Sequence, residues 1–444
     1  MTIKHAANYK GREGLVLVLV LWVLVMLTVL AATLALNTRL DNAVRAAGAD
    51  RVKARWLARA GVYRAFSEIA ADAGLTDAES DLWFDNKEAF EDIALPGGTF
   101  TVYADRFKDM NSYAYGVLDE ASKVNINTAT REMLLALPDM TDTLADAIID
   151  LRQQRQQNRP GALEKTGLED TPREPASSQP ALYTIRQLGW AEQMTREFLY
   201  GEDSNFNGIL ENNENDGEYL PPADNYDGIL DRGLLSYVTV YSYECNQDGT
   251  GNKRLNINTA DQQILQGQLS LHICYVNWIL KNRASGFAGI ANLLDQTTSK
   301  EDTNPGALID PKKSVPLDVA TFRRIADRIG VSDAEIIPGR ININTASAPV
   351  LQTLPEVELS LAERVIEQRK TLPEGFISIA EILTMEEITI ELFKKLAPLI
   401  TVRSNVFTVR SCGWTERSEL KHHIETVVAR SPRGLSVLYW KENH

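Results

Sequence analysis

The first 70 residues carry a hydrophobic pattern that changes character only once. From Leu15 to Leu36 the sequence contains no charged residue, and hydroxyl groups interrupt it only twice. A helix rises 1.5 Å per residue, so these 22 residues would span about 33 Å, enough to cross the hydrocarbon core of a bilayer. Further on, apolar residues keep returning at spacings of three and four up to Ile69. The pattern predicts a membrane helix that continues into water as an amphipathic stalk, together residues 15–70.

The segment does not have the form of a cleaved secretory signal. Such a signal has an apolar region of about 7–15 residues and an exit of the A-x-A kind. Here the apolar run is longer, and AATLALN offers only a weak version of that exit. We therefore expect this helix to remain in the protein as a membrane anchor.

The remaining chain has strand-like segments towards its two ends and a long helical middle. The strand-like segments are short, rich in β-branched and aromatic residues, and bounded by turn residues. They are residues 99–107, 112–120, 405–414, 422–431 and 435–442. Because two of them precede the helical region and three follow it, we expect one antiparallel sheet that is completed across an insertion. The predicted fold class is α+β, with a head formed by residues 71–121 and 401–444 and an inserted α-helical domain at residues 122–400.

Three copies of one sequence motif mark the insertion. VNINTA begins at residue 124, LNINTA at 255 and ININTA at 341, and each opens a longer match. Counted from the first asparagine of each motif, the copies agree without gaps at a leucine nine positions on and an arginine twenty-seven positions on. These residues are Asn125, Asn256 and Asn342, then Leu134, Leu265 and Leu351, then Arg152, Arg283 and Arg369. The pattern predicts three helix-hairpin-helix repeats, at residues 125–152, 256–294 and 342–383.

The threonine of each motif is expected to begin the first helix of its repeat. Its hydroxyl can accept a hydrogen bond from a free amide of the first turn, which predicts N-caps at Thr128, Thr259 and Thr345. Gln262 would complete a capping box with Thr259. Pro349 fits the same scheme, because the first turn of a helix tolerates proline.

Repeats that begin with this motif also occur in membrane-anchored DNA-uptake receptors, so a DNA receptor is the alternative function. Such repeats hold phosphate with a Gly-x-Gly hairpin that exposes backbone amides. The hairpins here read PDMTDT at 138 and PEVELS at 355, which remove the glycines and add carboxylates. The chain has 46 Lys and Arg against 60 Asp and Glu, a net charge of -14 that repels a phosphate backbone. We therefore expect no nucleic-acid partner, and a structural or partner-binding use of the repeats.

An acidic stretch inside the insertion, DSNFNGILENNE at residues 203–214, fits the calcium-loop template D-x-[DN]-x-[DN]-G-x5-E. In such a loop several oxygens and a final bidentate carboxylate surround the ion, and a glycine makes the sharp turn. The predicted ligands are Asp203, Asn205, Asn207, Ile209 through its carbonyl, Glu211 and Glu214. We expect a structural Ca²⁺ ion, because it would offset the entropy cost of ordering a long loop.

A second stretch, residues 224–233, repeats part of this pattern. The oxygen ligands that it offers are Asp224, Asn225, Asp227 and Asp231. An alanine and a leucine stand where the first and last ligands should be. We expect half a site there, completed by Asp224 or by Asp216 and Glu218 of the intervening loop. The predicted calcium loops together cover residues 203–233.

No catalytic arrangement emerges from the sequence. The five histidines lack partners at metal or triad spacing, and no glycine-rich phosphate loop, GxSxG elbow or HExxH motif is present. The adjacent His422 and His423 would point to opposite faces of a strand. The cysteines, Cys245, Cys274 and Cys412, lack zinc or redox spacing, and the sequence leaves open whether two of them form a disulfide. We expect a protein that is not an enzyme.

The N-terminus resembles the precursors of type IV pilins and of type II secretion pseudopilins. A short leader with three basic residues ends in Gly14, and the apolar run that follows becomes amphipathic. The resemblance implies that residues 1–14 are a leader, which prepilin peptidase removes between Gly14 and Leu15. Most pilins have a glutamate at the fifth mature position, where this chain has Leu19.

Loss of that glutamate is the usual departure of the minor pseudopilin K family of type II secretion. A glutamate buried in a membrane needs a partner that compensates its charge. A subunit with no neighbour above it lacks such a partner, so its glutamate would remain uncompensated. The three repeats and the altered hairpins are also similar to the inserted helical domain of that family. The resemblance extends along nearly the whole chain.

The resemblance implies a location and a role. Members of the family are placed at the tip of the pseudopilus, which they cap or initiate with the minor pseudopilins I and J and the other pseudopilins, to support export of folded proteins across the outer membrane. They bind calcium. The implied location is the inner membrane, crossed once, with the C-terminal domain in the periplasm.

Overall fold

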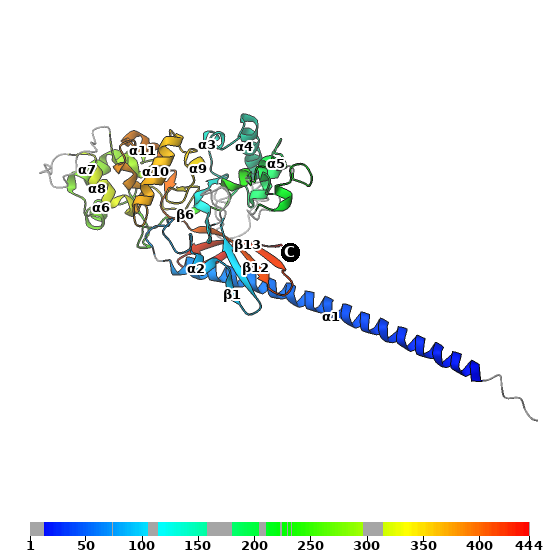
Figure 1. Cartoon of the computed structure of the whole chain (residues 1–444). Helices are drawn as coiled ribbons and strands as arrows, with labels where there is room; N and C mark the ends of the chain where they lie inside the picture. The colour runs from blue at the N-terminus through cyan, green and yellow to red at the C-terminus, as the bar shows by residue number, and fades with distance from the viewer. Residues whose placement is uncertain are drawn as a thin grey trace, which may run out of the picture.

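A long N-terminal helix projects from a head that consists of a sheet and a helical domain. The sheet lies between the long helix and the helical domain (Figure 1). The computed structural model describes residues 13–72, 74–104, 114–157, 180–203, 210–222, 224–228, 230–231, 233–295 and 314–443. The statements below refer to these residues.

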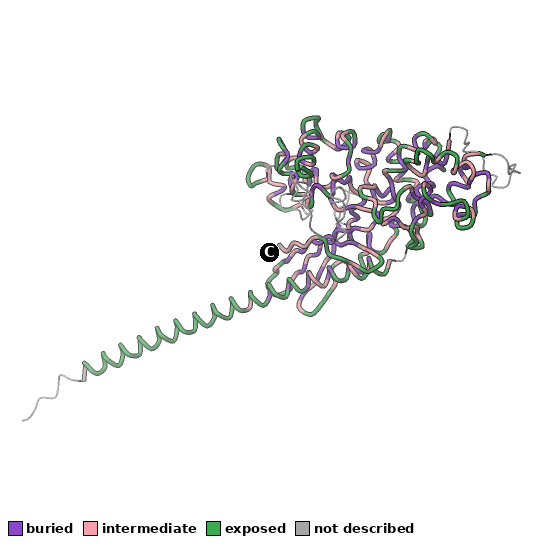
Figure 2. The backbone as a smooth tube through the Cα atoms, turned by 180° about the vertical axis from the view of Figure 1, so that it is seen from behind, coloured by how far each residue is buried: buried purple, intermediate pink, exposed green. Residues whose placement is uncertain are grey.

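Helix α1 (Glu13–Ala71) is 59 residues long and follows the predicted span and stalk. Its residues 15–36 are all exposed (Figure 2). Within the described chain, α1 is the one helix long and apolar enough to cross a membrane. Beyond residue 50 one face of the helix becomes buried at spacings of three and four. The buried apolar residues are Ala54, Leu57, Ala58, Val62, Ala65 and Ile69.

Six strands form one antiparallel sheet against that buried face of α1. They are β1 (Ile93–Leu95), β2 (Gly98–Tyr103), β3 (Leu118–Asp119), β12 (Val406–Thr415), β13 (Lys421–Ser431) and β14 (Gly434–Asn443). Their order is β1-β2-β12-β13-β14, and β3 pairs with the first residues of β12. A short helix, α2 (Lys87–Phe90), precedes β1. Strands from both ends of the chain share the sheet, so the predicted α+β class is confirmed.

The strand predicted at residues 112–120 is largely wrong. In its described part, only β3 and a single bridge at Ala114 are strand-like. The intervening backbone pairs with a turn instead, because the Val117 amide donates to the Trp83 carbonyl at 2.9 Å and the Asn86 amide donates to the Tyr115 carbonyl at 2.7 Å. Strand β1, which the sequence pattern does not predict, forms one edge of the sheet.

Glu442 of β14 ties α1 to the sheet. Its carboxylate accepts hydrogen bonds from Arg55 Nε at 2.6 Å, from Arg59 Nη2 at 2.9 Å and from Trp440 Nε1 at 3.0 Å. Desolvation acts to raise the pKa of this carboxyl, but the hydrogen bonds from the two arginines outweigh it and lower the pKa to about 2.

We expect Glu442→Gln to destabilise the protein in a pH-dependent way. The folded pKa lies below the ordinary value of 4.5, so the carboxylate stabilises the fold above pH 4.5 and loses this effect as the pH falls toward 2. The difference in urea midpoint between wild type and variant should be steady from pH 7 to pH 5 and then shrink toward pH 2. A difference that does not change down to pH 2 would contradict this role.

The inserted domain consists of three units of the same build. Each unit has a strand, two helices joined by a hairpin, a 3-10 turn, a third helix and a second strand that pairs in parallel with the first. Unit 1 contains β4 (Val124–Asn125), α3 (Arg131–Leu135), α4 (Asp142–Gln157), η3 (Ile185–Trp190), α5 (Arg196–Tyr200) and β5 (Val238–Thr239). Unit 2 contains β7 (Leu255–Asn256), α6 (Gln262–Leu269), α7 (Ile273–Asn282), η7 (Ile290–Leu293), α8 (Val319–Ile325) and β8 (Ile329–Gly330). Unit 3 contains β10 (Ile341–Asn342), α9 (Ala348–Leu351), α10 (Leu359–Thr371), η9 (Ile379–Thr384), α11 (Ile390–Leu396) and β11 (Ile400–Thr401).

Unit 3 lies between units 2 and 1 (Figure 1). One apolar core runs through all three units. Between units 2 and 3, the rings of Phe322 and Phe393 meet edge to face with centroids 5.7 Å apart. Two antiparallel strands, β6 (Tyr243–Cys245) and β9 (Ile336–Pro338), pair the segment that enters unit 2 with the segment that leaves it.

The second asparagine of each motif fastens the start of its unit to the segment before the 3-10 turn. Asn344 donates from Nδ2 to the Phe376 carbonyl at 3.0 Å and accepts from the Phe376 amide at 2.8 Å. Asn127 and Asn258 make the same double contact in units 1 and 2. An amide side chain can pair with a peptide group in this way because it offers one donor and one acceptor side by side.

The repeated arginine closes the same turn. Arg369 Nη1 donates to the carbonyls of Ile343 at 2.9 Å and Ala346 at 2.7 Å. Arg152 and Arg283 contact the equivalent carbonyls of their own units. The arginine therefore recurs in the sequence because it satisfies backbone carbonyls that the tight motif leaves open.

The predicted helix caps are wrong by two residues in every unit. The N-caps are Thr130, Asp261 and Ser347 rather than Thr128, Thr259 and Thr345. The motif itself folds as a turn, in which the first asparagine accepts a hydrogen bond from the amide of the second. Gln262 is thus the first residue of α6 and cannot form a capping box with Thr259. Pro349 does lie in the first turn of α9, as predicted.

Candidate calcium site and partner-binding face

The first predicted calcium loop is described only at its two ends. Asn205, Asn207 and Ile209 lie outside the described residues. Asp203 and Glu214, the first and last predicted ligands, are 8% and 1% exposed. Two carboxylates at the first and last positions of the template fit a divalent cation, because such a loop surrounds its ion with carboxylate and other oxygens.

Glu211 and Glu214 are brought together by a short turn, η4 (Asn212–Glu214). The Glu211 amide donates to Glu214 Oε2 at 3.1 Å, and the Glu214 amide donates to the Glu211 carbonyl at 3.0 Å. The last two predicted ligands of the first loop are therefore held together in one short turn, with the Glu214 carboxylate folded back to the backbone of Glu211.

In the second acidic stretch, Asp224 closes the loop. Its carboxylate accepts hydrogen bonds from the amides of Asp216, Gly217 and Tyr226 at 2.8 to 3.0 Å. Although desolvation acts to raise it, these bonds hold the pKa of Asp224 below its ordinary value. Both oxygens of Asp224 are engaged by backbone amides, which favours a role in loop closure over one as the first ligand of an ion.

The other predicted ligands of this stretch lie in one turn. Asn225 Nδ2 donates to Asp231 Oδ2 at 3.2 Å, and the Asp227 amide donates to Asn225 Oδ1 at 2.9 Å. Burial, with the nearby charges of Asp227 and Asp139, raises the pKa of Asp231. The chain thus gathers negative charge in this turn.

Glu202, which the calcium template does not include, joins the two acidic stretches. It is 6% exposed, and its carboxylate accepts hydrogen bonds from the amides of Asn225 at 3.2 Å and Asp231 at 3.0 Å. Burial raises the pKa of Glu202 in spite of these bonds. The only signal in the sequence is that this acid directly precedes the first predicted ligand.

Another group of carboxylates lies at the junction of head and insertion. Asp72, Asp77 and Asp81 offer oxygens within 4.8 Å of one another, the one such group that the described residues contain. Arg430 lies among them and donates to Asp72 Oδ2 at 2.8 Å and to Asp77 Oδ1. Because a guanidinium already compensates this group, we interpret it as a structural junction rather than a metal site.

The packed half of α1 leaves an apolar surface exposed on its other side. Val52, Trp56 and Tyr63 are 56%, 58% and 61% exposed, and their spacings of four and seven place them on one face of the helix. The guanidinium of Arg59 lies over the Trp56 ring, 5.1 Å from its centroid. We call Val52, Trp56 and Tyr63 the outer helix face. Exposed aromatic residues beside an arginine are typical of protein interfaces.

The predicted processing residues, Gly14 and Leu15, lie in the first turn of α1. Leu19 is 61% exposed on the same helix. The described part of the apolar span therefore presents no carboxylate to a neighbouring helix.

The hairpins of the repeats do not favour phosphate. The residue fourteen positions after the first asparagine has a positive φ in every unit, and it is Asp139 at 56°, Ser270 at 51° and Glu356 at 60°. This left-handed conformation favours glycine, yet two of the three residues are acidic. Asp142 then begins α4, and Glu358 is the N-cap of α10. Acidic residues at these helix N-termini repel a phosphate group, which would otherwise be attracted to the amides there.

The cysteines Cys245, Cys274 and Cys412 do not form a disulfide. Cys412 Sγ lies 3.8 Å from His423 Nε2. Burial raises the pKa of the Cys412 thiol to about 11 and lowers the pKa of His423 to about 4. Both groups are therefore neutral at pH 7, and the pair does not form a reactive thiolate. His422 is buried whereas His423 is half-buried, as expected for opposite faces of β13.

One family model matches part of the chain. Residues 341–403, which include all of unit 3, match the family described as "Type II secretion system (T2SS), protein K". No curated protein matches the chain. Among solved structures, a chain of the GspK-GspI-GspJ complex from the type 2 secretion system of enterotoxigenic Escherichia coli is 13% identical, with a TM-score of 0.33 over 90% of this chain and 98% of that one. This match over unit 3 confirms the resemblance to protein K that the repeats indicate, and the leader and Leu19 lie outside the matched residues.

Proposed function

We propose that this chain is a minor pseudopilin of type II secretion that caps or initiates the pseudopilus at its tip. The observation that carries the proposal is the build of α1, an exposed apolar span continuous with a half that packs on the head. This build suits a subunit that is anchored in the inner membrane and joins a bundle of similar helices. The family match over unit 3 supports the same assignment.

The tip position is supported by the shape of the head. The helical domain lies at the end of the molecule away from the membrane span and extends beyond the sheet on either side (Figure 1). Subunits of a helical filament stack along their N-terminal helices with an axial step much smaller than this head. A second copy directly above would collide with the inserted domain, and the absent glutamate at Leu19 agrees with a subunit that has no neighbour above it.

The partners we propose are the minor pseudopilins I and J, followed by the other pseudopilins. The outer helix face supports this assignment, because it offers an apolar and aromatic line that another amphipathic helix can cover. The single span and the large head correspond to one membrane crossing with the C-terminal domain in the periplasm. In that compartment the predicted structural calcium ion would order the two acidic stretches of unit 1.

The mature N-terminus tests the assignment as a pseudopilin. We expect mass spectrometry of the full chain, purified from cells that contain prepilin peptidase, to show a protein that begins at Leu15 with a methylated amine. An intact Met1 would make the chain a plain membrane anchor. As a check on the alternative function, saturable binding of duplex DNA to the full chain in detergent at low salt would favour a DNA receptor, which the acidic hairpins speak against.

Calcium is expected to stabilise the protein. A ligand present at 100 times its Kd adds about 2.7 kcal/mol to the free energy of unfolding. The wild type should therefore melt at a lower temperature with a chelator than with calcium, and Glu214→Gln should remove most of that difference. Glu192→Gln, an exposed acid outside the predicted loops, is the matched control and should keep it. If calcium shifts the melting temperature of neither the wild type nor the control, the protein has no stabilising calcium site.

A further inference from the structure

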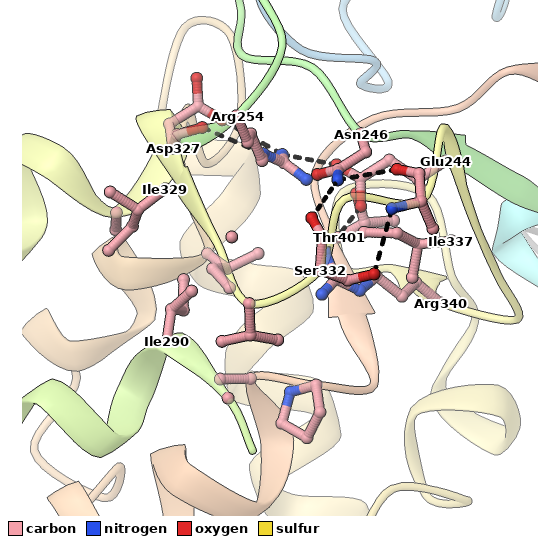
Figure 3. A pocket seen from close by; sticks show the side chains of 18 of the residues that line it. Glu244, Asn246, Arg254, Ile290, Asp327, Ile329, Ser332, Ile337, Arg340 and Thr401 are labelled. Atoms are coloured by element: carbon pink, nitrogen blue, oxygen red, sulfur yellow. Dashed lines mark hydrogen bonds and ion pairs between the residues drawn. The ribbon is translucent and has the colours of Figure 1, made fainter. Parts of the chain in front are cut away.

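A cavity of about 290 Å³ lies where unit 2 meets unit 3 (Figure 3). One part of its wall is apolar and includes Ile290, Ile329 and Val402. The opposite part is polar and includes Glu244, Asn246, Arg254 and Arg340. The cavity is separate from the outer helix face and from the predicted calcium loops, so the proposed function does not account for it.

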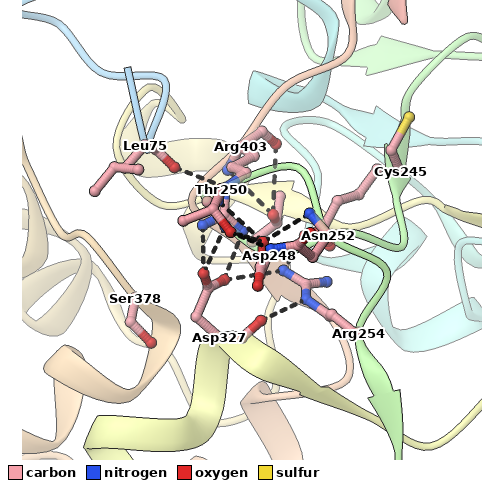
Figure 4. A network of polar contacts seen from close by, with 12 residues as sticks. Leu75, Cys245, Asp248, Thr250, Asn252, Arg254, Asp327, Ser378 and Arg403 are labelled. Carbon is pink, nitrogen blue, oxygen red and sulfur yellow. Dashed lines mark hydrogen bonds and ion pairs between the residues drawn. The ribbon is translucent and has the colours of Figure 1, made fainter. Parts of the chain in front are cut away.

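Five charged side chains of alternating sign lead to the polar part of the cavity (Figures 3 and 4). They are Arg403, Asp327, Arg254, Glu244 and Arg340. Arg403 contacts Asp327 at 2.6 Å, Arg254 contacts Asp327 at 3.3 Å and Glu244 at 2.6 Å, and Arg340 contacts Glu244 at 2.8 Å. The neighbouring Asp248 accepts hydrogen bonds from its own turn. This row of charges has three guanidinium groups and two carboxylates, and both of its ends are positive.

The two ends of the row differ. At one end, Arg403 Nε donates to the Leu75 carbonyl at 2.7 Å. At the other end, Arg340 Nε is buried and has no hydrogen-bond partner among the described residues. A negatively charged group of a ligand, placed in the cavity beside Arg340, would therefore continue the alternation of charges.

A second buried atom at this place also lacks a partner in the described chain. Asn246 is 2% exposed, and its Nδ2 donates to the carbonyls of Ser332 and Ala334, both at 2.9 Å. These two bonds fix the amide, and its Oδ1 is left without a donor. A buried polar atom without a partner destabilises the fold, and a ligand with a matching group would relieve this cost.

We propose that this cavity binds the carboxyl-terminal end of a polypeptide whose last residue is apolar. The terminal carboxylate accepts a hydrogen bond from Arg340 Nε and completes the alternating row. The amide N–H of the last residue donates to Asn246 Oδ1, and its side chain packs against Ile290, Ile329 and Val402. The volume lies just below the range of about 300–1,000 Å³ that is usual for small-ligand sites, so the cavity suits a chain end and not a folded domain.

The test compares two peptides that differ only at their last group. The probes are acetyl-Gly-Ala-Leu with a free carboxylate and the same peptide with a carboxamide, titrated by calorimetry into the full chain in detergent. We expect saturable binding of the acid and at least tenfold weaker binding of the amide, because only the acid supplies the missing negative charge. Equal affinities, or no binding of the acid at millimolar concentration, would overturn the proposal.

Two variants assign the binding to this cavity. Arg340→Lys keeps a cation for Glu244 but removes the Nε–H group, so it should weaken binding of the acid at least tenfold. Arg323→Lys, at an exposed arginine of unit 2, should leave it unchanged. Ile290→Trp fills the apolar part of the cavity from its half-buried side and should abolish binding. If both cavity variants bind the acid like the wild type, the peptide binds elsewhere and the proposal is wrong.

Discussion

Replacing Arg430 with methionine is expected to lower the free energy of unfolding by about 3–5 kcal/mol, because removal of one partner leaves a buried charge uncompensated. Arg430 contacts Asp72 at 2.8 Å, Asp77, and the Ser404 carbonyl at 2.9 Å. Asp77 is 2% exposed. Asp72 follows the last residue of α1 and Ser404 precedes β12, so this one side chain of β13 holds the end of the long helix, the head and the exit of the inserted domain together.

The loss in Arg430→Met should depend on pH. Burial raises the pKa of Asp77 to about 7 even beside Arg430, so this carboxyl favours the fold fully below its ordinary value of 3.8 and loses that effect as the pH rises through 7. Without the guanidinium the pKa rises further. The deficit, measured by urea denaturation, should therefore be largest at pH 8 and shrink toward pH 4.

Two further variants serve as controls for Arg430→Met. Adding Asp77→Asn should restore part of the loss, because it removes the uncompensated charge. Arg433→Met, at an exposed position of the same hairpin, should change stability by no more than about 0.5 kcal/mol. A deficit for Arg430→Met below about 1 kcal/mol at pH 8 would show that the junction does not depend on this ion pair.

Gly413→Ala is expected to destabilise the protein by about 3 kcal/mol, since overpacking of a rigid core costs about 1–3 kcal/mol and here it meets backbone. A Cβ at Gly413 of β12 would lie 2.2 Å from the Ala54 carbonyl oxygen and 2.4 Å from the Ala58 amide nitrogen of α1. Neither atom can move without shifting the helix away from the sheet. The loss should appear in the urea midpoint of the full chain.

The matched control for Gly413→Ala is the same substitution in the exposed part of α1. A Cβ at Gly48 meets no atom within 4 Å, and alanine favours a helix over glycine by about 1 kcal/mol. Gly48→Ala should therefore stabilise the protein slightly. If both substitutions stabilise, the close contact between α1 and the sheet is not maintained in solution.

The parts of the fold that the sequence predicts are those whose signal is local and periodic. The apolar run from Leu15 and the buried spacing up to Ile69 define α1 to within two residues at each end. The three C-terminal strands also fall within one residue of their expected bounds, because β-branched residues alternate along them between clear turns. The repeated asparagine motif predicts three equivalent units without any information on contacts between residues.

The details that the sequence does not predict depend on contacts between distant segments. The role of Arg369 becomes clear only once its guanidinium is seen to reach the carbonyls of its own motif, 23 and 26 residues earlier. The sequence predicts the caps two residues too early because threonine is a favourable N-cap, and only the turn around the first asparagine shows where the helix begins. Glu202 and the cavity beside Arg340 arise from packing between segments that carry no common pattern.

The central claim is that this chain occupies the tip of a pseudopilus, and its position in isolated filaments tests that claim most directly. We would attach a gold label to the exposed Gly434 turn between β13 and β14 and image purified pseudopili by electron microscopy. The account predicts one label at one end of each filament. Labels at regular intervals along the shaft would contradict it.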